Sequence, residues 1–347
     1  MTASLRVVSP GLLTTVQDRG RIGHQSLGVP VSGAMDLVSF EAANAIVGNP
    51  PGTEAFEIAY QGPTFAIESG SLRIAYVGGE AGIDIVARSG ETRRLPPMQS
   101  ERLVAGDLLR IGPLTGSAIG YLAIEGGIDV PPFLGSRATL TRGGIGGYKG
   151  RALAAGDVVA LRRAEAPVRE EVRLPSLDLR CPKRYRVVQG PQADYFTPEA
   201  IATLLSATYT ITPATDRMGM RVEGPKLQHD PALGFDIVSD GIAPGTIQVP
   251  GNGLPIILLA DRQTTGGYPK IATVISADLP ALGRLRPGGQ IAFEKVSVEE
   301  AQALYRIMAR ELGRLPDRLE PVPPQVRIDL DQLYSRNLVS GVVDAQR

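Results

Sequence analysis

Apolar residues along the chain gather in short stretches that are separated by turns rich in glycine and proline, a pattern typical of many short strands. In the first half of the chain, the predicted strands are 5–8, 13–16, 55–60, 64–68, 72–77, 83–87, 102–104, 107–111, 120–124 and 157–161. The turns between 55 and 111 follow one another closely. This spacing favours a barrel or a sandwich.

The second half repeats the same kind of pattern. Its predicted strands are 185–188, 209–211, 237–238, 246–249, 256–259, 272–275 and 290–294. Helical spacing of apolar residues appears in only three places: 36–47, 200–207 and 298–312. The chain is therefore predicted to be mainly β, with a few short helices.

Composition supports this interpretation. Glycine (41) and proline (28) make up about a fifth of the 347 residues, against a usual share of roughly 12%. Inside a helix, each glycine costs about 1 kcal/mol and each proline about 3 kcal/mol relative to alanine. A helix-rich fold would not tolerate so many of them.

The chain divides into three predicted parts around a segment rich in Pro, Glu and Arg at 164–182. We expect an N-terminal β-barrel domain at 1–165, a second β-barrel domain at 183–297, and a C-terminal helix and tail at 298–347. Residues 14–21 resemble 212–219, and each stretch contains an Asp-Arg pair. This echo predicts two related β domains.

Charge and cysteine content narrow the expected partners and cellular location of the protein. The 36 basic and 36 acidic residues balance, so we expect neither nucleic acid nor a membrane as a partner. No stretch reaches the 18 or so apolar residues of a membrane span, and the N-terminus has no apolar segment long enough for a signal peptide. A single cysteine, Cys181, permits no intrachain disulfide. The expected location is the reducing cytoplasm.

Several common chemistries are excluded by the residues present. The sequence contains no phosphate-loop motif and no serine nucleophile elbow. Metal-ligand clusters are not expected, because the only histidines are His24 and His229 and the cysteine is alone. We expect both histidines to be loop or surface residues.

Three polar clusters in glycine-rich loops remain as candidate sites. The first contains Asp18 and Arg19, with Ser32 downstream just ahead of the helix that begins near Asp36. Free backbone N–H groups there can bind an anion, although Ser32 or Asp36 can equally cap the helix.

The second cluster is Asp216-Arg217. Its arginine either forms a structural ion pair that shapes the loop or holds a carboxylate or phosphate in a two-pronged contact. The residues alone leave both alternatives open.

The third cluster carries the most varied chemistry. Gln248 lies in a strand that precedes the loop 261–270, whose polar residues are Asp261, Arg262, Gln263, Thr264, Thr265, Tyr268 and Lys270. A structural loop rarely needs a carboxylate, a guanidinium, an amide, hydroxyls, a phenol and an ammonium in ten residues. Its two glycines let the backbone approach a ligand closely. We expect a ligand-facing loop, with an ordinary solvated turn as the alternative.

Taken together, these segments resemble the KipA / allophanate hydrolase subunit 2 family, which is also the family of the C-type subunit of bacterial 5-oxoprolinase. The resemblance is carried by 10–21, 28–36, 43–49, 121–131, 134–137, 216–219, 245–250, 261–270 and 337–343. Single motifs here are weak, but their number and order make the assignment specific. Asp240 stands where the family pattern has Glu, and His24 where an aromatic residue is common.

The resemblance implies two cyclophilin-like β-barrel domains and a KipI-like protein, the B-type subunit, as a partner. It also implies a LamB/YcsF-like protein, the A-type subunit, in a hydrolase that uses ATP to open the cyclic amide of 5-oxoproline to glutamate. ATP is expected at the level of the complex, with a partner protein as one place for its site. Two alternatives follow from relatives: the carboxyltransferase component of a urea carboxylase, with biotin on a separate carrier, and a non-catalytic regulator that binds a KipI-like kinase inhibitor.

Residue chemistry then assigns expected roles. Asp261, Lys270 and Tyr268 are the candidate catalytic residues: a base or its orienter, a cation that stabilises developing negative charge, and a hydrogen-bond donor. The candidate substrate-binding residues are Arg262, Gln263, Thr264, Gln248, Arg217, Asp216, Asp18, Arg19 and Ser32. No metal site is expected.

Overall fold

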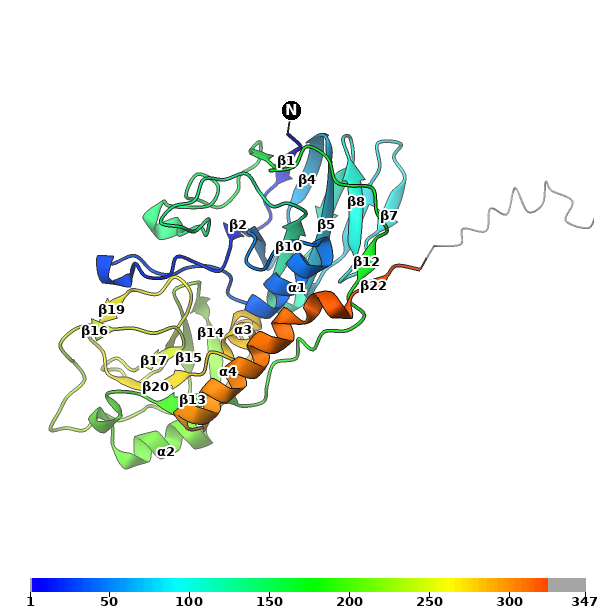
Figure 1. Cartoon of the computed structure of the whole chain (residues 1–347). Coiled ribbons are helices and arrows are strands. Elements are labelled where there is room, and N and C mark those ends of the chain that lie inside the picture. The colour runs from blue at the N-terminus through cyan, green and yellow to red at the C-terminus, as the bar shows by residue number, and fades with distance from the viewer. Residues whose placement is uncertain (1, 324–347) are drawn as a thin grey trace, which may run out of the picture.

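The computed structural model describes residues 2–323, and these form two β-rich units with a long helix along the seam between them (Figure 1). The predicted mainly β fold class is confirmed. The tail segment 337–343, which contributes to the family resemblance, lies outside the described residues.

The first unit consists of two antiparallel sheets. A six-stranded sheet has the order β11-β1-β4-β9-β6-β7, and a five-stranded sheet has the order β2-β3-β10-β5-β8. The strands are β1 (Ser4–Ser9), β2 (Leu13–Gln17), β3 (Ala55–Ala59), β4 (Thr64–Ser69), β5 (Ser71–Glu80), β6 (Ile83–Val86), β7 (Thr92–Arg94), β8 (Ser100–Val104), β9 (Leu108–Ile111), β10 (Thr115–Ile124) and β11 (Val158–Ala160).

The two sheets pack face to face, and helix α1 (Leu37–Val47) covers the other face of the five-stranded sheet. Phe56 on β3 stacks on Phe65 on β4 with ring centroids 5.2 Å apart. On the opposite face, Phe40 of α1 meets Tyr121 of β10 edge to face at 5.7 Å. The five-stranded sheet is therefore buried on both sides, which explains its nearly continuous apolar strands.

The second unit is a closed barrel with the strand order β13-β20-β17-β18-β15-β14-β21. Its strands are β13 (Tyr185–Gln189), β14 (Thr208–Thr215), β15 (Gly219–Glu223), β17 (Thr246–Gln248), β18 (Ile256–Leu258), β20 (Lys270–Val274) and β21 (Gln290–Lys295). The accompanying elements are α2 (Pro198–Ser206), α3 (Leu279–Arg284) and the small pair β16 (Asp240–Gly241) and β19 (Thr265–Gly266). Short 3-10 turns are η1 (Gln25–Leu27), η2 (Thr141–Gly143) and η3 (Ala193–Tyr195).

Helix α4 (Val298–Gly313) runs along both units, as Figure 1 shows. The chain then passes through η4 (Leu315–Arg318) to β22 (Glu320–Pro321), which pairs with β12 (Val172–Arg173) beside the first unit. The predicted linker is thus partly packed: Leu174 is buried, and Glu171 binds the fully buried Arg73. The division into domains at 1–165, 183–297 and 298–347 stays a prediction.

Most of the predicted elements are present, but one strand prediction is wrong. Residues 237–238 form no strand: Ile237 is only half-buried and Val238 is 92% exposed, so this apolar pair does not belong to the core. Strands β7 and β15, helix α3 and the two-residue strands β12, β16, β19 and β22 are not among the predicted elements. All of them are short, with six residues or fewer.

The sequence echo between 14–21 and 212–219 has a local explanation. Asp18 accepts a hydrogen bond from the N–H of Gly20, and Asp216 accepts one from the N–H of Met218. Both are the same side-chain turn, which Asp forms readily. The units themselves differ in sheet organisation, one having two sheets and the other a closed barrel.

A close backbone contact joins the units at Gly283. A Cβ atom added there would lie 2.7 Å from the carbonyl oxygen of Met35. We expect Gly283→Ala to lower the free energy of unfolding by about 1–3 kcal/mol, because backbone must shift to relieve the overlap. Urea denaturation of the purified chain measures this. Gly313→Ala is the matched helical control, since no atom lies within 4 Å of its added Cβ; equal stability of the two variants would contradict the prediction.

Candidate functional site

The loop 261–270 connects β18 to β20, and its side chains lie in three separate environments. Its first residue joins a buried ion network, Arg262 lines a cavity between the units, and Gln263 and Tyr268 line a pocket beside the barrel. The predicted single cluster is therefore divided by the fold.

The buried ion network is centred on Arg217. Its Nε and Nη2 donate to the two oxygens of Asp261 at 2.8 and 3.1 Å, and its Nη1 donates to Glu57 of β3. Nη2 also donates to the carbonyl of Gly33 at 2.7 Å. The hydroxyl of Tyr121 donates to the other oxygen of Glu57 at 2.5 Å. One arginine of the second unit is thus bound on both sides of the seam.

The pKa of Arg217 reflects these contacts with the two carboxylates. Burial alone lowers the pKa of Arg217, but the carboxylates of Glu57 and Asp261 raise that pKa well above its ordinary value. All three guanidinium nitrogens have partners within the protein. Arg217 thus has a structural role, as one of the two alternatives proposed, but its partners are Asp261 and Glu57 rather than the adjacent Asp216. Asp261 has both oxygens on Arg217, so its carboxylate is engaged in the network.

A second ion pair crosses the seam nearby. Asp36 caps α1 by accepting hydrogen bonds from the N–H groups of Val38 and Ser39, and Nη1 of Arg284 in α3 lies 2.9 Å from its carboxylate. Asp36 rather than Ser32 is therefore the helix cap. Ser32 adopts a left-handed backbone (φ 56°), and its N–H donates to the carbonyl of Ala260 at 3.2 Å.

The barrel pocket, defined here by Asp216, Gln248, Gln263, Tyr268 and Arg142, is an open cavity of about 470 Å³. Nε2 of Gln263 lies 3.4 Å from Oε1 of Gln248, and Nε2 of Gln248 donates to the carbonyl of Tyr268 at 3.3 Å. Tyr268 is 41% exposed. Two side-chain amides and a phenol therefore face a space of a size suited to a small molecule.

Lys270 lies next to this pocket, in register with Gln248 across the barrel wall. Its side chain is buried, and Nζ contacts the carboxylate of Asp240 at 2.8 Å. The hydrogen bond from Lys270 lowers the pKa of Asp240. Strand β16, which contains Asp240, pairs with β19 of the loop, and this pairing holds the carboxylate of Asp240 against the ammonium group of Lys270.

Gly266 allows the two amides to approach. A Cβ atom at this position would lie 2.7 Å from Nε2 of Gln248. The neighbouring Thr264 contributes its backbone carbonyl, which accepts from the N–H of Ile242 at 3.0 Å. The loop is thus held by its backbone, while its side chains project to either side.

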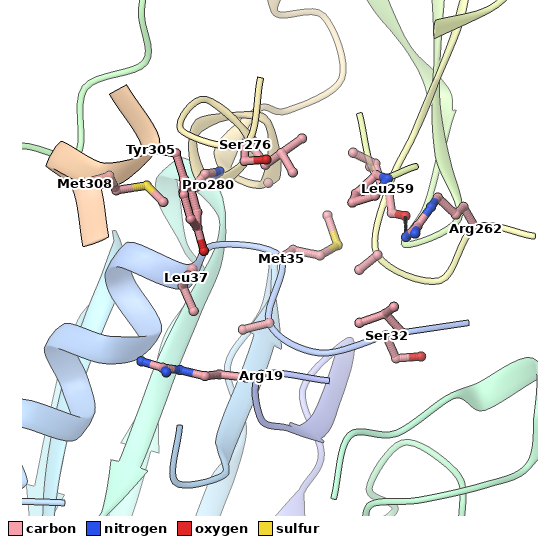
Figure 2. Close-up of a pocket in the computed structure, with 16 residues that line it drawn as sticks. Arg19, Ser32, Met35, Leu37, Leu259, Arg262, Ser276, Pro280, Tyr305 and Met308 are labelled. Carbon is pink, nitrogen blue, oxygen red and sulfur yellow. Dashed lines mark hydrogen bonds between the residues drawn. The ribbon is translucent and has the colours of Figure 1, made fainter. Parts of the chain in front are cut away.

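The cleft cavity, of about 270 Å³, lies between the two units and α4 (Figure 2). Arg19, Ser32 and Arg262 line it together with apolar side chains. Nε of Arg19 pairs with Glu41 at 2.5 Å, and half of the Arg19 side chain is exposed. Asp18 does not face this cavity as a free group, because it accepts hydrogen bonds from Gly20, Ser136 and Arg137.

The structure therefore sorts the predicted residues. Gln248, Gln263, Tyr268 and Asp216 share the barrel pocket; Arg19, Ser32 and Arg262 share the cleft cavity; Asp18, Arg217 and Asp261 are occupied by internal contacts; and Lys270 and Thr264 lie beside the barrel pocket.

Sequence reasoning missed the first unit's part in the ion network. A glutamate inside an apolar strand, as Glu57 is in β3, was the available signal. Arg284 gave no comparable signal, because α3 was not predicted.

Within residues 2–323, the structure contains no group of three or more side chains able to hold a metal ion. No helix in that range is long and apolar enough to cross a bilayer.

Comparisons with known proteins agree on one family. Residues 27–295 match the model described as "Carboxyltransferase domain, subdomain A and B". The C-type subunit of Escherichia coli 5-oxoprolinase is 35% identical over 91% of this chain and 98% of its own length. Saccharomyces cerevisiae urea amidolyase is 34% identical over 87% of this chain but only 17% of its own length.

Solved structures show the same likeness. The crystal structure of the K. lactis urea amidolyase superposes with a TM-score of 0.80 at 29% identity, covering 90% of this chain and 20% of that one. The crystal structure of TTHA0988 gives a TM-score of 0.73 at 38% identity, covering 84% of this chain and 55% of that one. The expected family is thereby confirmed: the chain belongs to the carboxyltransferase domain family that includes the C-type subunit of 5-oxoprolinase and the corresponding region of urea amidolyase.

Proposed function

We propose that this protein is the C-type subunit of an ATP-dependent 5-oxoprolinase in the cytoplasm. One observation carries the proposal: the similarity to the corresponding E. coli 5-oxoprolinase chain extends over 98% of that relative. Relatives belonging to enzyme complexes support an enzyme-associated role for this chain. The reaction consumes two water molecules. As the lactam C–N bond of 5-oxoproline breaks, one water gives its hydroxyl to the carbonyl carbon and a proton to the nitrogen. The second water is used when ATP is converted to ADP and phosphate.

The barrel pocket supplies groups suited to a small cyclic amide. An amide presents one N–H donor and one carbonyl acceptor, and the side chains of Gln248 and Gln263 offer the complementary groups. The phenol of Tyr268 donates a further hydrogen bond. The ammonium of Lys270 beside the pocket stabilises negative charge that develops on the carbonyl oxygen.

The proposal includes two partner proteins. A KipI-like B-type protein completes the site, and a LamB/YcsF-like A-type protein joins the complex. The sequence of this chain contains no phosphate-loop motif, which favours an ATP site on a partner. No metal ligand from this chain takes part in the proposal.

Reconstitution tests the function directly. The chain is mixed with its B-type and A-type partners, and ADP release and glutamate formation are measured with and without 5-oxoproline. We expect ATP hydrolysis that depends on 5-oxoproline and on all three chains. Turnover that is unchanged when this chain is left out would refute the proposal.

A carboxyltransferase role is the second candidate, and the family match over residues 27–295 favours it. In this case carboxybiotin on a separate carrier donates its carboxyl group to a urea-type amide. The chain spans less than a fifth of the curated urea amidolyases that it matches, so the activity of those larger proteins is a proposal here. Transfer of labelled carboxylate from a biotinylated carrier to urea distinguishes this candidate from the first.

A further inference from the structure

We propose that the cleft cavity is a binding site for a small organic carboxylate with an apolar body, held by Arg262. This site is distinct from the barrel pocket and goes beyond the proposed function. It lies between the two units and α4, and Figure 2 shows the guanidinium end of Arg262 turned toward Leu259 and the interior of the cavity.

Arg262 is a buried cation with an unused donor. The side chain is 2% exposed. Its Nε donates to the carbonyl of Ile242 at 3.2 Å, and its Nη1 lies 3.4 Å from the carbonyl of Leu259. Among the residues that the structure describes, Nη2 has no hydrogen-bond partner. A buried arginine nitrogen left without an acceptor is unfavourable, so an acceptor on a ligand in the adjoining cavity would stabilise it.

Within the described part of the chain, no carboxylate neutralises Arg262 at close range. Its neighbour Asp261 is bound through both oxygens to Arg217. Burial lowers the pKa of Arg262 to about 10, and only Asp261 opposes this effect. A bound carboxylate would supply the missing negative charge and a short, charge-assisted hydrogen bond.

The rest of the cavity is largely apolar. Met35 lines it from the first unit, Leu259 from the second, and Met308 from α4 (Figure 2). Leu279 of α3 also lines it. These walls differ from the barrel pocket, where amides and a phenol predominate. A cavity of about 270 Å³ equals the liquid volume of roughly nine water molecules at about 30 Å³ each. The occupant is therefore small, with one anionic end and a hydrocarbon body.

Only an organic anion can bind Arg262 and also cover the apolar walls of the cavity. Inorganic phosphate would satisfy Arg262 but leave the methionine and leucine side chains in contact with water. A hydrocarbon ring or chain removes that surface from water at about 25 cal/mol per Å². The geometry thus selects a monocarboxylic acid rather than a free phosphate.

Calorimetric titration of the full chain tests this site with three probes: cyclohexanecarboxylate, its neutral amide cyclohexanecarboxamide, and inorganic phosphate. We expect the carboxylate to bind at least tenfold more tightly than either of the others. We also expect Arg262→Gln to weaken carboxylate binding at least tenfold while amide binding changes little. Equal binding of carboxylate and amide, or tighter binding of phosphate, would overturn the proposal.

A second pair of variants keeps the test independent of any folding defect at Arg262. Met308→Trp fills the cavity from α4 and is expected to abolish carboxylate binding. Ala309→Trp adds the same ring at the next position of α4, which is exposed, and should bind normally. Undiminished binding by Met308→Trp would place the ligand elsewhere and refute the site.

This binding measurement tests the cleft cavity independently of the proposed enzymatic activity. Binding is measured on the single chain without ATP or partners, so loss of 5-oxoprolinase activity would not affect the result. If 5-oxoproline itself binds at Arg262 more tightly than cyclohexanecarboxylate, the apolar-body assignment is wrong and the cavity belongs to the substrate.

Discussion

Replacing Arg217 by methionine is expected to lower the free energy of unfolding by about 3–5 kcal/mol, the usual effect of breaking a buried ion pair from one side. The substitution leaves the carboxylates of Glu57 and Asp261 buried without their cation. Both are 5% exposed or less, so water can compensate little of the loss. Denaturant unfolding at neutral pH measures the change.

Arg142→Met is the matched control. Arg142 also pairs with an aspartate, Asp216 at 3.6 Å, but both side chains are more than half exposed. Pairs of this kind are worth about 0–1 kcal/mol. Adding Glu57→Gln and Asp261→Asn to Arg217→Met should recover part of the lost stability, because the unpaired charges are then gone. If Arg217→Met costs no more than its control, the network does not hold the units together.

Lys270→Met is expected to lower 5-oxoproline-dependent turnover by about 10²–10³-fold, the usual effect of removing one group that stabilises a developing oxyanion. Methionine keeps most of the apolar stem but removes the charge that contacts Asp240. The measurement is ADP release by the complex reconstituted with its partner proteins. This prediction rests on the proposed function, unlike the stability prediction for Arg217.

Lys295→Met provides the comparison. Lys295 also lies in the barrel wall, on β21, but its ammonium contacts Gln189 at the surface. We expect it to keep full turnover. Should Lys270→Met retain turnover while it still assembles with its partners, the loop 261–270 is not the reaction centre.

The sequence suggested that Asp261→Asn would remove a catalytic carboxylate and lower turnover. The structure instead places this carboxylate on Arg217, so we expect the main effect of Asp261→Asn to be a lower free energy of unfolding. The two ion pairs across the seam, Glu57–Arg217 and Asp36–Arg284, also fix how the units face each other. They thereby define the cleft cavity that Arg262 lines.

Local patterns in the sequence were enough to predict the fold class, the start of helix α1 and the family of this protein. The excess of glycine and proline and the short apolar stretches indicated a mainly β fold, because those residues are unfavourable in helices. The start of α1 was expected near Asp36, since Asp is a good helix cap. The ordered motifs also identified the family. These features depend only on residues that are neighbours in the chain.

Only the tertiary structure decided how the loop 261–270 is used. Consecutive side chains in a non-helical segment point in different directions, so Asp261, Arg262 and Gln263 enter three environments although they are adjacent. The contacts of Asp261 come from distant parts of the chain: Arg217 lies 44 residues before it, and Glu57, which Arg217 also binds, lies 160 residues before Arg217. No local pattern encodes such a contact, because it depends on how the first unit packs against the barrel. The sequence by itself therefore singled out this loop as a candidate site, and the packing of the two units determined which of its residues hold the structure and which line a cavity.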